Sequence, residues 1–161
     1  MDLPKRKSPR IPGYDYSTPN YYFITICTHE KRCIFGGPEK LGPYGLIARE
    51  YLLNIPKYFP GIKVEKAVIM PNHVHAIMVV TPNAEENGRK DLTLAIGQYK
   101  MAVTKAIRAV EQGKQVWQRS FHDHVIRSQK RYEQIWTYIH YNPQKWSEDG
   151  FYVSEETESV L

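Results

Sequence analysis

The sequence predicts an α+β fold of the ferredoxin-like split βαβ type, in which helices cover one face of an antiparallel sheet. Two observations favour it. Stretches of β-branched and aromatic residues alternate with stretches of helical periodicity in the order β-α-β-β-α-β, and one more helix follows. A chain of 161 residues, 42% of them hydrophobic, is also long enough for one domain with its own core.

The first half of the chain supplies three strands and one helix. Residues 20–28 are almost all β-formers and are expected to form the first strand. A helix is expected over 44–55, where apolar residues fall near one helical face, and Pro56 should end it. The runs 62–70 and 73–80 are expected to be two strands joined by a tight turn.

The second half begins with the clearest helix of the sequence. Asp91 is a good N-cap for an amphipathic helix over 92–110, whose apolar residues recur every three or four positions. A short strand is expected over 124–127. Ser128 is expected to cap the last helix, which should span 129–142 because Pro143 disfavours helical geometry in the residue before it.

One short stretch joins a turn to a buried strand that starts with two histidines. Met70-Pro71-Asn72-His73-Val74-His75 places His73 and His75 two positions apart. On a strand these side chains point to the same face, about 7 Å apart along the chain. The pair can therefore chelate a metal ion. The alternative is that both are polar residues hydrogen-bonded to a loop at the strand end.

The last helix carries a second group of candidate site residues. Tyr138 and Asn142 are four residues apart and share one helical face, beside an apolar edge formed by Ile135 and Ile139. The Asn142 carbonyl oxygen can serve as a third metal ligand, and the Tyr138 phenol then lies near the same ion. This combination permits nucleophilic attack on a phosphate. No general base is evident, and packing is the alternative role for Tyr138.

The charge distribution favours a polyanionic partner. The formal net charge is +5, and all 22 Lys and Arg residues precede residue 147, whereas 147–161 contains five acids. Without that segment, 22 basic and 12 acidic residues remain, a net charge of +10. Nucleic acid is the first candidate partner, and a merely soluble basic protein is the alternative. The segment 147–161 is interpreted as a disordered acidic end that competes with nucleic acid for the basic surface.

Candidate DNA contacts lie in a basic N-terminal arm, on the exposed side of the helix 92–110, and around the short strand 124–127. The arginines and lysines are expected to contact phosphates, and the tryptophan either stacks on a base or belongs to the core. A second His-x-His pair, His122-Asp123-His124, competes weakly for the metal role. The candidate DNA-binding residues are Lys5, Arg6, Lys7, Arg10, Lys100, Lys105, Trp117, Arg119 and Arg127.

Four stretches carry a family resemblance: 11–16 with 22–28, then 68–75, 116–127 and 138–146. The most specific motifs in them are Met-Pro-Asn-His-Val-His at 70–75 and Tyr-Ile-His-Tyr-Asn-Pro at 138–143. On these motifs the chain resembles the single-tyrosine HUH (His-hydrophobic-His) transposases. It is most similar to their REP-associated tyrosine transposase branch.

The resemblance implies a fold like the one above and a metal-dependent transesterase that cuts single-stranded DNA beside palindromic hairpins. Cleavage would leave a 5′-phosphotyrosine and a free 3′-hydroxyl. By position, His73 and His75 match the metal-binding pair, Tyr138 the nucleophile and Asn142 the third ligand, with Mg²⁺ or Mn²⁺ as the ion. The Asn142 position is a glutamine in related transposases outside this branch. Single-stranded or hairpin DNA is the implied partner, and relatives act as monomers or homodimers.

The expected organisation is one catalytic domain over 1–146, whose first 19 residues form the basic arm, followed by the acidic tail 147–161. No apolar run reaches the ~18 residues of a membrane helix, and no signal peptide is evident. Two cysteines do not make a disulfide framework. A cytoplasmic protein is therefore expected. Two other classes stay open: a non-cleaving, domesticated binder of hairpin or single-stranded DNA, and an RNA-binding module using Tyr21 and Phe23. A metallohydrolase is weaker, because no matching carboxylate cluster is evident.

Overall fold

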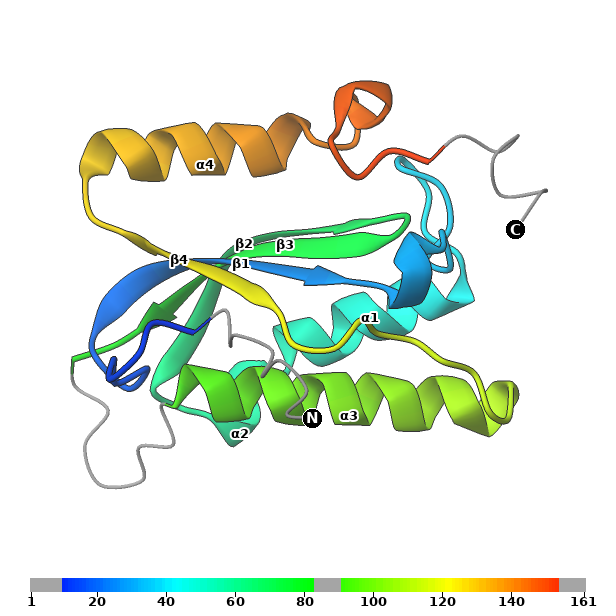
Figure 1. Cartoon of the computed structure of the whole chain (residues 1–161), viewed down its shortest axis with the longest axis horizontal. Coiled ribbons are helices and arrows are strands. Elements are labelled where there is room, and N and C mark those ends of the chain that lie inside the picture. Colours follow the sequence, from blue (N-terminus) through cyan, green and yellow to red (C-terminus); the bar gives the residue numbers. More distant parts are fainter. Residues whose placement is uncertain (1–9, 83–90, 154–161) are drawn as a thin grey trace, which may run out of the picture.

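The protein is a four-stranded antiparallel sheet with helices on both faces (Figure 1). The computed structural model describes residues 10–82 and 91–153. The strand order β2-β3-β1-β4 is that of a ferredoxin-like split βαβ, and the predicted fold class is confirmed. The strands are β1 (Asn20–Cys27), β2 (Ile62–Met70), β3 (His73–Val80) and β4 (His122–Ile126).

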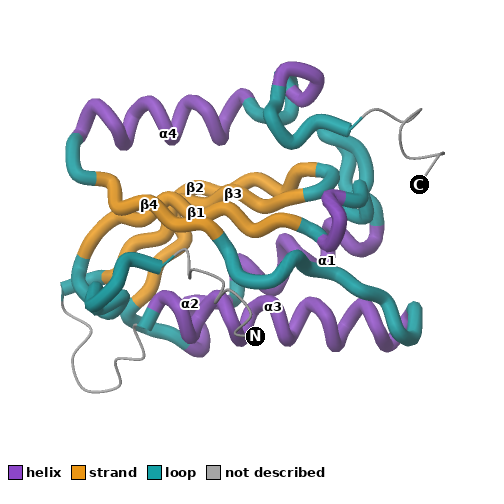
Figure 2. Tube along the Cα trace, viewed as in Figure 1, coloured by secondary structure: helices purple, strands orange, loops and turns teal. Residues whose placement is uncertain are grey.

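The helices form two layers around the sheet, as Figure 2 shows. Helices α1 to α3 lie on one face, and α4 lies alone on the other. The additional helix expected to carry the nucleophile therefore packs on the face that the split βαβ leaves open. The helices are α1 (Pro43–Leu53), α2 (Ile55–Tyr58), α3 (Leu92–Val110) and α4 (Gln129–Tyr141), with short 3₁₀ helices at His29–Lys31 and Trp146–Glu148.

Element boundaries agree with the sequence expectations to within one residue except at two places. Helix α1 ends at Leu53 rather than at Pro56, and Pro56 lies in the first turn of the short helix α2. A proline is tolerated there because the first N–H groups of a helix have no intrahelical partner. Strand β4 starts two residues before the expected 124–127 and ends at Ile126, so it includes His122.

Both capping residues have the geometry that starts a helix. The Asp91 carboxylate accepts a hydrogen bond from the Leu94 amide at 3.0 Å, which confirms it as the N-cap of α3. The Ser128 hydroxyl accepts one from the Arg131 amide at 3.1 Å and starts α4 in the same way. The start of α4 is thereby fixed directly after β4.

The two faces of β3 have different roles. Val74 and Met78 point into the main core, against α1 and α3. His73, His75 and Ile77 point to the opposite face, since side chains alternate along a strand. There Ile77 packs with Ile126, Ile135 and Ile139, which docks α4 on the sheet. Burying each isoleucine contributes about 1.5–3 kcal/mol, so this cluster holds the helix of Tyr138 over the histidines.

In the part of the chain that the structure describes, no helix has both the length and the apolar character needed to cross a membrane.

Candidate metal and nucleophile site

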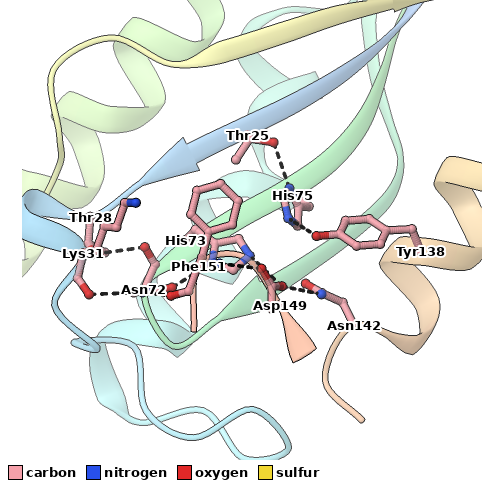
Figure 3. Close-up of polar contacts among 10 residues, drawn as sticks. All are labelled: Thr25, Thr28, Lys31, Asn72, His73, His75, Tyr138, Asn142, Asp149 and Phe151. Carbon is pink, nitrogen blue, oxygen red and sulfur yellow. Dashed lines mark hydrogen bonds and ion pairs between the residues drawn. The ribbon is translucent and has the colours of Figure 1, made fainter. Parts of the chain in front are cut away.

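The structure brings together all four residues that the sequence assigned to the reaction. His73 and His75 are 0% and 2% exposed, and their ring centroids lie 4.5 Å apart. Tyr138 and Asn142 face them from α4 and from the residue directly after it (Figure 3). One half of the cluster thus comes from the sheet and the other half from the C-terminal helix.

Asn72, the residue before the first histidine, sets the protonation of the His73 ring. Its side-chain amide nitrogen donates to the carbonyl oxygens of Lys31 at 3.1 Å and Phe151 at 2.7 Å. The amide oxygen therefore faces Nδ1 of His73, 2.8 Å away, and Nδ1 must carry the proton. The lone pair of His73 is left on Nε2, which points to Asn142 and Asp149.

His75 is held between the sheet and the candidate nucleophile. Its Nδ1 lies 2.9 Å from the hydroxyl oxygen of Thr25, and its Nε2 lies 3.4 Å from the hydroxyl oxygen of Tyr138. The ring of Phe23 stacks on the His75 ring with centroids 5.2 Å apart. The contacts with Thr25 and Phe23 of β1 fix the orientation of the imidazole. Its Nε2 is then directed towards the Tyr138 hydroxyl.

Asp149 is a further member of the cluster. The sequence grouped it with a disordered acidic end over 147–161, but the structure places it beside His73. Its side chain is fully buried; one carboxylate oxygen accepts from the Asn142 amide nitrogen at 2.6 Å and lies 3.7 Å from Nε2 of His73. The potential ligand atoms of His73, His75 and Asp149 all lie within 4.8 Å of one another. One feature of the sequence could have indicated that Asp149 is buried. Phe151 lies two residues further on, and a large apolar side chain is unusual in a fully solvated acidic segment.

The residues present fit a divalent cation. Among the residues that the structure describes, the buried Nε2 of His73 and the buried Oδ1 of Asn142 have no hydrogen-bond partner. Buried polar atoms are rarely left in this state, and both point into a cluster that already holds a carboxylate. Two imidazole nitrogens with carboxylate and amide oxygens form a mixed donor set of the kind that divalent metals take. Asn142 turns its nitrogen to Asp149 and so keeps its oxygen available.

Burial shifts the pKa of each titratable group at the site. It lowers the pKa of His73 to about 4, although the nearby Asp149 carboxylate opposes the shift. Burial also lowers the pKa of His75 well below its usual value, and His73 adds to this effect. Both rings are therefore neutral at pH 7, the form that binds a metal. Burial and the charge of Asp149 raise the pKa of Tyr138, so the phenol is protonated.

The candidate DNA-binding residues fall into separate groups. Lys100, Lys105, Trp117 and Arg119 line one groove of about 850 Å³ between α3 and the segment before β4. Of these, Lys105 and Arg119 are exposed, whereas the Lys100 ammonium group donates to the carbonyl oxygens of Gln118 and Ser120. The Trp117 ring packs against Phe35 and Tyr99, which supports its core role rather than base stacking.

The remaining candidates lie elsewhere. Arg10 forms an ion pair with the buried carboxylate of Asp123 at 2.5 Å, and its guanidinium lies over the Phe121 ring. The side chain is therefore engaged within the protein rather than extended towards DNA. Arg127 is exposed at the end of β4. Lys5, Arg6 and Lys7 lie outside the described residues. Because Asp123 points away from His122 and His124 and pairs with Arg10, this rival His-x-His has no carboxylate available for a metal.

Solved structures of other proteins share this fold. A REP-associated tyrosine transposase bound to a REP hairpin superposes with a TM-score of 0.63 and 21% identity, over 90% of this chain and 74% of that one. A Deinococcus radiodurans protein provisionally described as a transposase superposes with a TM-score of 0.52 and 17% identity, over 81% and 95% of the two chains. The fold is therefore that of tyrosine transposases.

Sequence relatives define the family. A Haemophilus influenzae protein of no assigned function is 34% identical over 168 aligned positions, covering 92% of this chain and 93% of that protein. A second H. influenzae protein, provisionally named a REP-associated tyrosine transposase, is 30% identical over 137 positions, covering 81% and 74%. No family model matches the chain. The chain belongs to the REP-associated tyrosine transposase family, which confirms the resemblance seen in its four stretches.

Proposed function

We propose that this protein is a metal-dependent, single-stranded DNA transesterase that cuts beside palindromic hairpins and forms a 5′-phosphotyrosine. The observation that carries the proposal is the position of the Tyr138 hydroxyl, 3.4 Å from Nε2 of His75, at the edge of the His73–His75–Asp149 cluster. Family membership supports a role in DNA transposition. The hairpin bound by the solved relative supports hairpin DNA as the partner.

Four side chains would hold the ion, Mg²⁺ or Mn²⁺: His73 and His75 through nitrogen, and Asn142 and Asp149 through oxygen. When bound, such an ion supplies Lewis-acid polarisation of a phosphate oxygen. Asn72 and Thr25 orient the two imidazoles through Nδ1. This arrangement keeps each ring fixed, so the ligand atoms need little reorganisation when the site is used.

Tyr138 performs the covalent step. Its phenolic oxygen attacks the scissile phosphorus and forms a new P–O bond, while the bond from phosphorus to the 3′-oxygen breaks. The proton lost by the phenol balances the proton gained by the leaving 3′-oxygen, which gives a free 3′-hydroxyl. The reverse attack by a 3′-hydroxyl on the phosphotyrosine joins DNA strands and releases Tyr138.

The test is adduct formation with a labelled single-stranded hairpin oligonucleotide on a denaturing gel, with Mn²⁺, Mg²⁺ or EDTA. We expect a metal-dependent band of DNA bound to protein, which Tyr138→Phe abolishes while DNA binding persists. Tyr141→Phe is the matched control, because both tyrosines lie on α4 and are 44% exposed. An adduct that survives Tyr138→Phe would show that another residue is the nucleophile.

One observation favours a second function, that of a non-cleaving binder of hairpin or single-stranded DNA. The Phe151 ring lies over His73 with centroids 4.6 Å apart, and the Asn142 amide is engaged by Asp149. These residues cover the histidines from the side opposite the sheet (Figure 3). Tight hairpin binding without any adduct, in Mn²⁺ and in Mg²⁺, would establish this second function and exclude the first.

A further inference from the structure

The strand β4 carries two histidines that the reaction does not use. In the antiparallel pairing, His75 of β3 stands opposite Thr25 of β1, and Thr25 stands opposite His122 of β4. Directly paired residues on neighbouring strands share a face of the sheet. His122 is therefore on the same face as the metal-site histidine His75, two strands away. His124 follows in the next row, opposite Phe23.

The part of this face around His122 and His124 is exposed. Helix α4 packs mainly over β2 and β3, as the contacts between elements show, and leaves β1 and β4 less covered (Figures 1 and 2). His122, His124 and Tyr21 are exposed, Tyr21 by 42%, and Phe23 is half-buried. We call these four residues, Tyr21, Phe23, His122 and His124, the β1–β4 strip.

The chemistry of the strip suits single-stranded nucleic acid. His122 and His124 are exposed imidazole rings, on which bases of any sequence can stack and which can also donate to phosphate oxygens. The other two rings are partly engaged within the protein, Tyr21 edge-on with Tyr132 and Phe23 stacked on His75. The exposed Arg127 directly follows β4 and lines the same hollow as Tyr21. The nearest acid in this strand, Asp123, points to the other face and is neutralised by Arg10.

The strip leads directly to the nucleophile. The Phe23 ring stacks on His75 and also meets the Tyr138 ring edge-on, with centroids 6.4 Å apart. We propose that the β1–β4 strip holds the single-stranded segment next to the hairpin and guides the scissile phosphate to Tyr138. This inference rests on the proposed function, since it assigns the path of the DNA strand in the same reaction.

The strip can be tested by binding alone, without cleavage. Two oligonucleotides share one hairpin: the first is the bare stem-loop, and the second adds single-stranded flanks on both sides. Their dissociation constants are measured by fluorescence anisotropy in EDTA for the wild type, His122→Ala/His124→Ala and the two single His→Gln variants. His140→Ala is the control, because His140 is an exposed histidine whose Nδ1 lies 3.0 Å from Lys66 Nζ on β2, the edge strand opposite β4.

We expect the double variant to bind the flanked hairpin about tenfold more weakly, since loss of base stacking and phosphate contacts weakens binding by about five- to 150-fold per base. Its affinity for the bare stem-loop should change less than twofold, and His140→Ala should match the wild type with both DNAs. Equal losses with the two oligonucleotides, or no loss with either, would overturn the proposal.

The result is independent of the cleavage chemistry. If the wild type forms no adduct in Mn²⁺ but the double variant still loses affinity for the flanked DNA alone, the transesterase function fails and the strip stands. If the wild type forms the adduct but the variants bind both DNAs normally and react at the wild-type rate, the strip fails and the transesterase function stands.

Discussion

Replacing Asn72 by alanine is the sharpest test of how the site is built. Asn72 is fully buried, and its side chain makes three hydrogen bonds, to His73, Lys31 and Phe151. The two bonds to carbonyl oxygens contribute about 1 kcal/mol each, and the buried N–H of His73 left without its acceptor costs about 1–3 kcal/mol. We therefore expect Asn72→Ala to lower the free energy of unfolding by about 3–5 kcal/mol.

The same substitution should weaken metal binding. Without Asn72, nothing holds the proton of His73 on Nδ1, and loss of such an orienting partner typically lowers metal affinity about 10- to 100-fold. Urea denaturation in EDTA measures the stability, and calorimetric titration with Mn²⁺ measures the affinity. At about 2–4 °C per kcal/mol for a chain of this size, the Tm should fall by about 6 to 20 °C.

Asn72→Asp separates the two effects. A carboxylate can accept from His73 but cannot donate to the carbonyl oxygens of Lys31 and Phe151, so we expect lost stability with Mn²⁺ affinity better retained than in Asn72→Ala. The reasoning is refuted if Asn72→Ala unfolds within about 0.5 kcal/mol of the wild type and binds Mn²⁺ equally well.

Three further outcomes are expected. Asp149→Asn should weaken Mn²⁺ binding by at least about tenfold, measured by calorimetry, because an anionic ligand becomes neutral; an unchanged affinity would remove Asp149 from the ligand set. In EDTA the free energy of unfolding should reach its full value above about pH 6.5 and decrease as the pH drops towards 4. The reason is that the pKa values of His73 and His75 are lowered in the folded state, so the unfolded state binds more protons over this range. A urea midpoint that stays constant between these pH values would contradict the prediction. Asp123→Ala should cost about 3 kcal/mol in urea denaturation, because it leaves Arg10 without its buried counter-ion; a wild-type midpoint would deny the ion pair a structural role.

The fold was predictable because its elements carry strong local signals. The run His73–Val80 is apolar along nearly its whole length, and β3 is the buried strand that such a run predicts. Asp91 and Ser128 marked both helix starts through their side-chain oxygens. The break between α1 and α2 was not predictable in the same way, since Pro56 is compatible both with a helix end and with the first turn of a new helix.

The site was predictable only where periodicity places side chains. Strand and helix spacing put His73 beside His75 and Tyr138 beside Asn142, and the family motifs related the two pairs. Asp149 lies in an irregular segment after α4, where no period fixes the direction of a side chain. Its position depends on tertiary contacts, including the hydrogen bond from Asn142. Composition therefore grouped it with the acids at 147–161.

The same carboxylate has opposite effects on the two halves of the reaction. Asp149 adds negative charge beside the Nε2 of His73, which favours a cation at the site. Together with burial, Asp149 raises the pKa of Tyr138 and so opposes loss of the phenolic proton during the attack on phosphorus. Neutralising the charge of Asp149 would remove its part of this effect, whereas the effect of burial would remain. The fold therefore sets the position of Tyr138, while the pKa of its phenol also depends on the charge of Asp149.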